Sequence, residues 1–262
     1  MIDKAKKIGL PLAFGAVIIV LLQTGVIHKA FGIKILQLPL PSDILKAFCE
    51  NFTGILENSK TTVLPAVCGL VLGSIIGYLA ALLVTALPNA GYGCLILITM
   101  INSIPIVALA PLMNRWFENP FCGKLTVIAI ASLGSMAVNA FHGLNDVDKS
   151  AIALMHSNAS SKIRIFTKLR IPNSLPSVFT ALKISVSAAM TATIISEFFS
   201  SATSGLGYMI KYTLKVGNQK QIGWAYIAAV SVLSVIIYAL VSLAEKYFIK
   251  WHVSQRQLNS NQ

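Results

Sequence analysis

The sequence has few charged residues: they make up 11% of its 262 positions, and only nine are acidic. Soluble domains carry about 25% charged and about 45–50% apolar residues, whereas this chain is 55% hydrophobic with a mean hydropathy of +0.74. An ordinary soluble globular domain is therefore excluded. A net charge of +12 would suggest nucleic acid for a soluble protein. In a membrane protein, lysine and arginine instead collect in loops and at helix ends, so we expect a lipid bilayer and no nucleic acid as partner.

The four cysteines follow no pattern that would bind a metal or form a disulfide framework. No CxxC pair and no interleaved histidine accompanies Cys49, Cys68, Cys94 and Cys122. The chain also contains no G-x-x-x-x-G-K-[ST] phosphate loop, no H-E-x-x-H and no G-x-S-x-G motif. We therefore expect no metal site, no catalytic residue and no cofactor bound by this chain.

Long apolar runs dominate the sequence. A helix that crosses a hydrocarbon core of about 30 Å needs about 20 mostly apolar residues. Six runs reach or approach this length, at residues 8–27, 62–87, 94–113, 125–141, 177–199 and 223–249. The first is longer than the apolar region of a signal peptide, so we interpret it as a retained anchor. The sequence predicts an all-α membrane protein with about six transmembrane helices.

The positive residues bear on the orientation of these spans. Lys4, Lys6 and Lys7 precede the first run, and five positive residues lie between the fourth and fifth runs. Both features favour cytoplasmic N- and C-termini in a multi-pass protein of a bacterial-type plasma membrane, because positive loops stay inside. The total bias between the two sides is small, so the charge count alone does not set the topology.

Two loops are long enough to carry structure of their own. Within residues 28–60, a Leu-Pro-Leu-Pro-Ser stretch precedes a predicted amphipathic helix over 44–56. The other loop, 146–171, is the most polar internal segment and lies between spans four and five. We divide the chain into an N-terminal span with its outer segment (1–60), a transmembrane core (61–250) and a polar tail (251–262).

The loop at 146–171 predicts two short helices. Its apolar residues recur at helical spacing, namely Ile152, Met155, Ala159, Ile163 and Phe166. Serines and an asparagine at 157–161 interrupt this pattern and are able to cap a new helix. The second helix has a basic rear half, with Lys162, Arg164, Lys168 and Arg170. Such a helix either docks on a soluble partner or lies on lipid headgroups.

Glu197 is an acidic residue inside a predicted span, where a charge is costly and points to a functional site. Further polar groups occur in the same run, namely Ser187, Thr191, Thr193 and Ser196. Glu197 either lines a solute pathway or lies near the outer interface, neutralised by protonation or by Ser200, Ser201 or Thr203. Lys183 is too far along a helix to pair with Glu197, so we expect it to extend toward the cytoplasmic surface.

Glycine and proline residues indicate the local backbone geometry or packing at three further positions. Gly69, Gly73 and Gly77 form two overlapping GxxxG patterns, which predict close packing of another helix. Pro105 and Pro111 predict a bend in the third span, either beside a translocation path or without further role. Gly205 and Gly207 suit a tight turn at the outer mouth, where a gate would lie.

Four stretches, in family order, resemble the binding-protein-dependent ABC importer permeases of the nitrate, sulfonate and taurine subgroup. They are Leu-Pro-Leu-Pro-Ser at 38–42, Ile-Pro-Ile-Val-Ala-Leu-Ala-Pro-Leu at 104–112, the loop ending in Ile-Pro at 171–172, and Ser-Glu-Phe-Phe at 196–199 with Gly-Leu-Gly-Tyr at 205–208. In that family the loop carries a Glu-Ala-Ala start and a glycine. Here these positions hold Ala153, Leu154 and Met155, and Ala159, so the acidic residue and the glycine are both missing.

The resemblance implies a coupling loop that contacts an ATPase, through Ala153, Met155, Ala159, Ile163, Arg164, Phe166, Lys168 and Pro172. It implies a permease subunit of an ATP-driven importer with a second permease chain, cytoplasmic ATPases that bind ATP and Mg²⁺, and an extracytoplasmic substrate-binding protein. The solute would be a sulfonate-, taurine- or nitrate-like anion or a vitamin-precursor heterocycle. The candidate pathway or gate residues are Glu197, Ser196, Thr193, Pro105, Gly205 and Gly207. The alternative is an ion-coupled secondary transporter or channel that uses Glu197.

Overall fold

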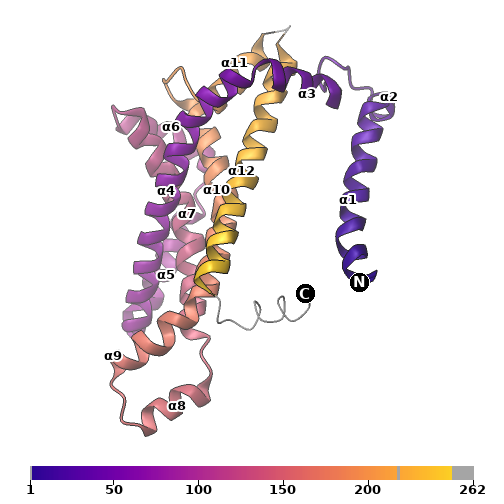
Figure 1. Ribbon diagram of the computed structural model, residues 1–262. Coiled ribbons are helices and arrows are strands. Elements are labelled where there is room, and N and C mark those ends of the chain that lie inside the picture. Colours follow the sequence, from indigo (N-terminus) through magenta and orange to yellow (C-terminus); the bar gives the residue numbers. More distant parts are fainter. Residues whose placement is uncertain (1, 217–218, 250–262) are drawn as a thin grey trace.

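The computed structural model describes residues 2–216 and 219–249, and all regular secondary structure in these ranges is helical (Figure 1). The elements are α1 (Ile2–Gln23), α2 (Val26–Phe31), α3 (Pro41–Glu50), α4 (Phe52–Ala86), α5 (Pro88–Asn102), α6 (Ile106–Trp116), α7 (Pro120–Asn145), α8 (Lys149–Ser157), α9 (Lys162–Ile165), the π-helical turn η1 (Phe166–Arg170), α10 (Ile171–Phe199), α11 (Leu206–Lys215) and α12 (Lys220–Phe248). The predicted tail at 251–262 lies outside the described residues.

The centre of the molecule is a bundle in which α7 packs along both α4 and α10. Three glycines of α4, Gly69, Gly73 and Gly77, lie against α7. A Cβ atom at Gly69 would come within 2.7 Å of the Ile128 Cβ atom, and one at Gly73 would collide with the backbone of Ala129. The two helices therefore approach at a distance that side chains at these positions would forbid.

Apolar side chains fill the bundle and also cover its outside. Val127 and Ile128 of α7 are fully buried, whereas Leu64 and Leu83 of α4 are 60% and 61% exposed. Apolar residues on both the inner and outer surfaces are expected where hydrocarbon replaces water as the surrounding medium. The bundle thus has the surface of a membrane protein.

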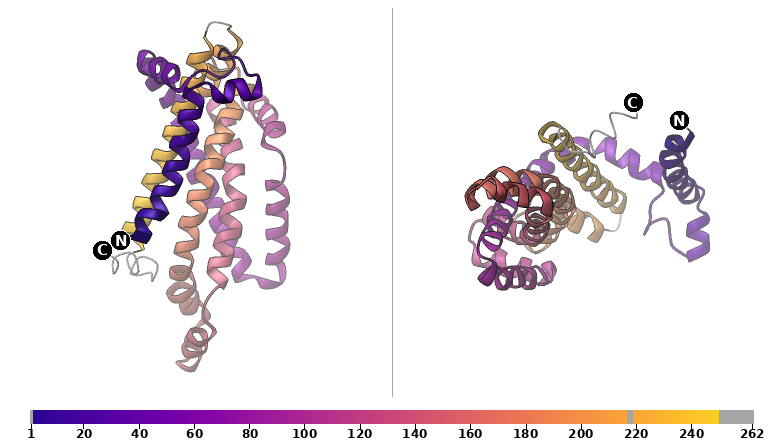
Figure 2. Two further views of the ribbon diagram at one scale, coloured as in Figure 1. Left: turned by 90° about the vertical axis from the view of Figure 1, so that its right-hand side faces the viewer. Right: turned by 90° about the horizontal axis from the view of Figure 1, so that it is seen from below.

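Four helical stretches are long and apolar enough to cross a membrane: Phe52–Ala86, Pro120–Asn145, Lys162–Phe199 and Lys220–Phe248. A fifth crossing results if α5 and α6 are taken together, and α1 contributes only the shorter apolar stretch Ala13–Gln23. The predicted count of six spans is therefore not confirmed. Helix α1 stands apart from the bundle and packs against α2 and α3 (Figures 1 and 2).

The third predicted span, 94–113, is wrong as one continuous helix. Helix α5 ends at Asn102, α6 begins at Ile106, and the two are bent by 90°. Pro105 lies at the break as the N-cap residue of α6. The break has a direct cause, because proline lacks the N–H that a continuing helix needs and disfavours helical geometry in the residue before it.

The outer segment also differs from its prediction. Instead of one helix over 44–56, α3 starts at Pro41 and ends at Glu50, and α4 begins at Phe52. Asn51 separates them, and its side-chain Nδ2 donates a 2.9 Å hydrogen bond to the Ala47 carbonyl. Local bonds of this kind compete with regular helical bonding, which favours asparagine at helix ends.

Figure 1 shows where the connections lie. Helices α8 and α9 lie at one end of the bundle, which we call the loop end; α3, α6 and α11 lie at the other, which we call the α11 end. Helix α1 begins, and α12 ends, toward the loop end. The two ends carry the two sets of candidate residues described next.

Candidate functional site

The loop at 146–171 contains the two short helices predicted from its sequence. Asp148 caps α8, accepting a 2.9 Å hydrogen bond from the Ser150 N–H, and Ser161 caps α9, accepting one of 3.3 Å from the Arg164 N–H. Helix α9 then runs through η1 directly into α10, without a non-helical residue between them. A movement of α9 therefore has a continuous helical connection to the membrane-spanning part of α10.

Ala159 joins the two helices in a left-handed conformation, with φ of 51°. It is the one non-glycine residue with positive φ in the described part of the chain. Glycine adopts this conformation freely, while an L-residue with a Cβ atom is strained there by about 1–2 kcal/mol. The position where the resembling family has glycine thus keeps the glycine-type backbone geometry although its side chain has changed.

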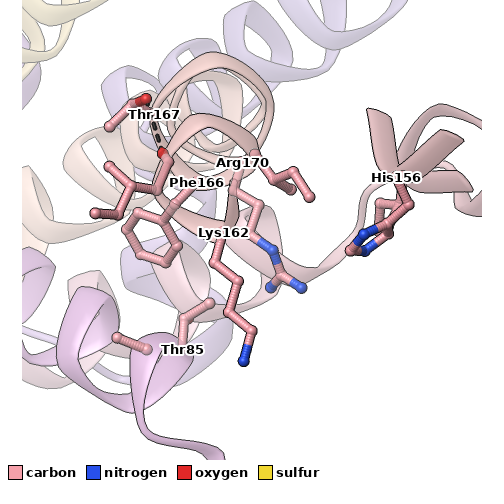
Figure 3. Close-up of a pocket in the computed structure, with 10 residues that line it drawn as sticks. Thr85, His156, Lys162, Phe166, Thr167 and Arg170 are labelled. Atoms are coloured by element: carbon pink, nitrogen blue, oxygen red, sulfur yellow. Dashed lines mark hydrogen bonds between the residues drawn. The ribbon is translucent and has the colours of Figure 1, made fainter. Parts of the chain in front are cut away.

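A pocket of about 520 Å³ lies between the end of α4 and this loop (Figure 3). Its basic lining comes from His156 of α8, Lys162 of α9 and Arg170 of η1. Thr85 of α4 and Phe166 of η1 also line it. Arg170 Nη1 donates a 2.8 Å hydrogen bond to Asn145 Oδ1, which fixes its guanidinium group near α7. Sequence reasoning placed Lys162 and Arg170 in the basic half of the second helix but gave His156 no role. Nothing local to these residues shows that α4 ends beside them.

The predicted loop residues do not share one buried stripe. Ala153, Ala159, Ile163, Arg164 and Lys168 are exposed, and Met155, Phe166 and Pro172 are half-buried. Ile165 is the buried residue of α9, whereas the Ile163 side chain is 76% exposed. The π turn accounts for part of this difference, because its extra residue rotates the preceding helix relative to the one that follows. Ile163 and the 64% exposed Leu154 leave two large apolar side chains on the surface of this polar loop.

At the α11 end, Glu197 forms a buried ion pair that sequence reasoning missed. Lys124 Nζ of α7 lies 2.9 Å from Glu197 Oε1, and the two side chains are 5% and 0% exposed. Thr62 of α4 donates a 3.0 Å hydrogen bond to the same carboxylate. The alternative in which Ser200, Ser201 or Thr203 neutralises Glu197 is therefore wrong. In the sequence Lys124 directly precedes the apolar run at 125–141, but α7 begins at Pro120 and places this lysine inside the bundle.

The same cluster binds the turn that leads into α11. The Gly207 N–H donates a 2.7 Å hydrogen bond to Glu197 Oε2, and the Leu206 N–H donates one of 2.8 Å to Thr62 Oγ1. Gly205 has φ of 111°, and a Cβ atom there would collide with the Glu197 carboxylate. Glycine at this position is therefore required by both backbone conformation and space.

The remaining candidate pathway residues divide between this cluster and another place. Ser196 donates a 3.1 Å hydrogen bond to Asn114 Oδ1, and Thr193 donates one of 2.7 Å to the Ala189 carbonyl. Both are fully buried next to Glu197 on α10. Pro105 is instead exposed at the α5–α6 break.

A second ion pair joins α10 to α12. Lys183 Nζ lies 2.9 Å from Glu245 Oε2, with 21% and 17% of the two side chains exposed. The expectation that Lys183 extends toward the cytoplasmic surface is therefore wrong. A lysine inside a span gains more from a facing carboxylate than from a stretched side chain.

The long apolar helices and the ion pairs between them define a multi-pass α-helical membrane protein. The chain belongs to the family of binding-protein-dependent transport system inner membrane components, because the family profile matches residues 73–250. It is the permease subunit of an ABC importer in the bacterial inner membrane, which works with a separate ATPase and a substrate-binding protein. The predicted fold class and permease function are confirmed.

Relatives extend over most of the chain. It is 26% identical over 187 residues to the formylaminopyrimidine transport permease protein of Halalkalibacterium halodurans, covering 71% of this chain and 74% of that protein. It is 25% identical over 163 residues to the putative aliphatic sulfonates transport permease protein of Escherichia coli, covering 59% and 58%. An amino acid ABC transporter solved with histidines shares the fold, with a TM-score of 0.63 at 16% identity, over 76% of this chain and 96% of that one.

The strained loop residue gives a first prediction. Ala159→Val should destabilise the α8–α9 loop, because a β-branched residue is a marked outlier in the left-handed region, while Ala159→Gly should leave it as stable or more so. The measurement is the rate of tryptic cleavage at Lys162 and Arg164 in the purified protein. Ala153→Val, at an exposed position of α8, is the matched control. Equal cleavage rates for the two Ala159 variants would show that the left-handed conformation of residue 159 does not limit the stability of the loop.

The buried ion pair gives a second prediction. Glu197→Gln should lower thermal stability strongly, because an unpaired buried Lys124 costs about 3–5 kcal/mol. Adding Lys124→Met should recover much of this loss, since both charges are then gone. Glu245→Gln, in the less buried pair, is the control and should cost less. The measurement is the unfolding midpoint in detergent. A smaller lowering of the midpoint for Glu197→Gln than for Glu245→Gln would contradict the prediction.

Proposed function

We propose that two copies of this chain form the membrane part of the importer, with two cytoplasmic ATPase subunits at the loop end and a substrate-binding protein at the α11 end. The observation that carries this assignment is the α8–α9 loop, which presents exposed Leu154 and Ile163 beside exposed Arg164 and Lys168. Apolar side chains with basic neighbours suit a docking surface better than a purely solvated loop.

The coupling that we propose runs along the chain from this loop. ATP and Mg²⁺ bind to the partner ATPases, not to this chain, and ATP binding closes them against each other. The movement enters at α8 and α9 and reaches the spans through η1 and α10, which are one uninterrupted helical path. The pathway then opens outward to accept solute, and hydrolysis returns it to the inward state.

The proposed orientation places the loop end in the cytoplasm. The start of α1 and the end of α12 lie toward that end (Figure 1), so both termini would be cytoplasmic. Four basic residues of the loop would face the same side, namely Lys162, Arg164, Lys168 and Arg170. This arrangement agrees with the retention of positive residues on the cytoplasmic side of bacterial membranes.

We assign Glu197 and the two glycines to positioning at the outer mouth. The carboxylate holds the Gly205–Gly207 turn and α11 against α4 and α7, so α11 follows movements of the bundle. An ion-coupled role for Glu197 gains no support from this geometry, because the carboxylate is buried and paired with Lys124. The solute would be a small organic molecule of the kinds named for the relatives, a pyrimidine or a sulfonate.

The docking role predicts that charge reversal in the loop weakens ATPase binding. With Arg164→Glu and Lys168→Glu combined, less ATPase should co-purify with the permease, because an acidic surface that meets this loop would be repelled. Lys215→Glu, an exposed charge at the α11 end, is the matched control and should leave the yield unchanged. Undiminished ATPase recovery with the double variant, in protein of normal unfolding midpoint, would refute the docking role.

The homodimer predicts that differently tagged copies assemble. When two tagged versions of this chain are expressed together with the ATPase, purification through one tag should recover the other at a comparable amount. Mixing the two versions after separate purification is the control for non-specific association. If purification through one tag recovers the ATPase but not the other tagged version, the second permease chain is a different protein.

A further inference from the structure

A second pocket, of about 320 Å³, lies between α10 and α12 within the membrane-spanning part of the bundle. Hydroxyl groups line it from both helices: Ser187 and Thr191 from α10, and Ser231 and Ser234 from α12. Ser187 and Thr191 are four residues apart, so they lie on the same face of α10, one turn above the other. The pocket is at the lower limit of the sizes typical for small-molecule sites.

Two of these hydroxyls have no partner within the part of the chain that the structure describes. Thr180 and Thr193 of the same helix donate to carbonyls one turn earlier, Pro176 and Ala189, at 2.9 and 2.7 Å. Neither Ser187 nor Thr191 makes such a bond, and both are exposed. A hydroxyl in a membrane span normally bonds to its own helix or to a neighbour. These two therefore remain available to donate to a third group.

The hydroxyl oxygens of α12 supply hydrogen-bond acceptors to the pocket. Ser231 donates to the Ile227 carbonyl at 3.1 Å and Ser234 to the Val230 carbonyl at 2.9 Å. Each hydroxyl has one proton and two lone pairs, so their oxygens can still accept. The pocket thus offers donors from one wall and acceptors from the other.

No net charge accompanies these groups. Lys183 lies one turn from Ser187 on α10, about 6 Å along the axis, but it is paired with Glu245 of α12. None of the residues that line the pocket is charged. An anionic solute would lose its hydration here without gaining a counter-charge, which is costly in a low-dielectric setting.

We propose that this pocket contacts the transported solute inside the membrane and that the solute is uncharged, with hydrogen-bond donors and acceptors, of the size of a single-ring heterocycle. The proposal rests on the permease function and narrows its solute class. Met190 and Ile194 supply the apolar part of the lining, which suits the faces of a ring while the hydroxyls bind its edge.

The test measures water access first. Ser187→Cys and Thr191→Cys are made in the full chain, purified with its ATPase, reconstituted in liposomes and treated with N-ethylmaleimide, an uncharged thiol reagent. Only a hydrated thiol ionises and reacts, so both should label at least about tenfold faster than Val235→Cys. Val235 is the matched control because it follows Ser234 on α12 and is 66% exposed on its outer surface. The unsubstituted chain gives the background from its four native cysteines.

The second arm tests the solute class. Formylaminopyrimidine should slow the labelling of Ser187→Cys, whereas ethanesulfonate at the same concentration should not. Labelling no faster than Val235→Cys would show that lipid fills the pocket and would overturn the site. Protection by ethanesulfonate, or by neither solute, would overturn the assigned class. ATPase co-purification with each variant reports the permease function separately, so its loss is distinguishable from a failure of this site.

Discussion

The arrangement at the α11 end depends on one buried ion pair. Lys124 of α7 and Glu197 of α10 meet inside the bundle at 2.9 Å, and the carboxylate also accepts from Thr62 of α4 and from the backbone of Gly207. Three spans and the start of α11 thus share one carboxylate. A charge buried in this way is tolerated only while every partner stays in place, so these four elements are constrained to move together.

The loop end, in contrast, is only loosely packed against the bundle. Its loop contains short helices with local caps, a strained Ala159 and side chains that are mostly exposed, and few buried contacts hold it to the bundle. It is connected to the bundle by the helical path through η1 into α10 and by the hydrogen bond from Arg170 to Asn145. A loop that is loosely packed outward but continuous with a span suits the transmission of movement from a soluble partner. The tightly bonded α11 end would then move as one piece in response.

Many elements of the fold were predictable from local sequence. Apolar runs gave the long helices, the serines at 160 and 161 gave the start of α9, and the glycine spacing in α4 gave its close packing face. Pro105 predicted a bend but not its size, since the 90° angle depends on what α5 and α6 pack against. The partners of Glu197 and Lys183 were missed, because Lys124 is 73 residues from Glu197 and Glu245 is 62 residues from Lys183.

The sequence by itself therefore determined the class of protein: an all-α membrane chain with a polar internal loop, four family-like stretches and no ATP-binding motif of its own. These properties depend on composition, periodicity and spacing, which are local. Only the tertiary structure decided which charges neutralise each other, which face of α9 is buried, and which hydroxyls of α10 remain unpaired. The physical reason is that ion pairs and hydrogen bonds act over a few ångströms in space, and distance along the chain carries almost no information about them.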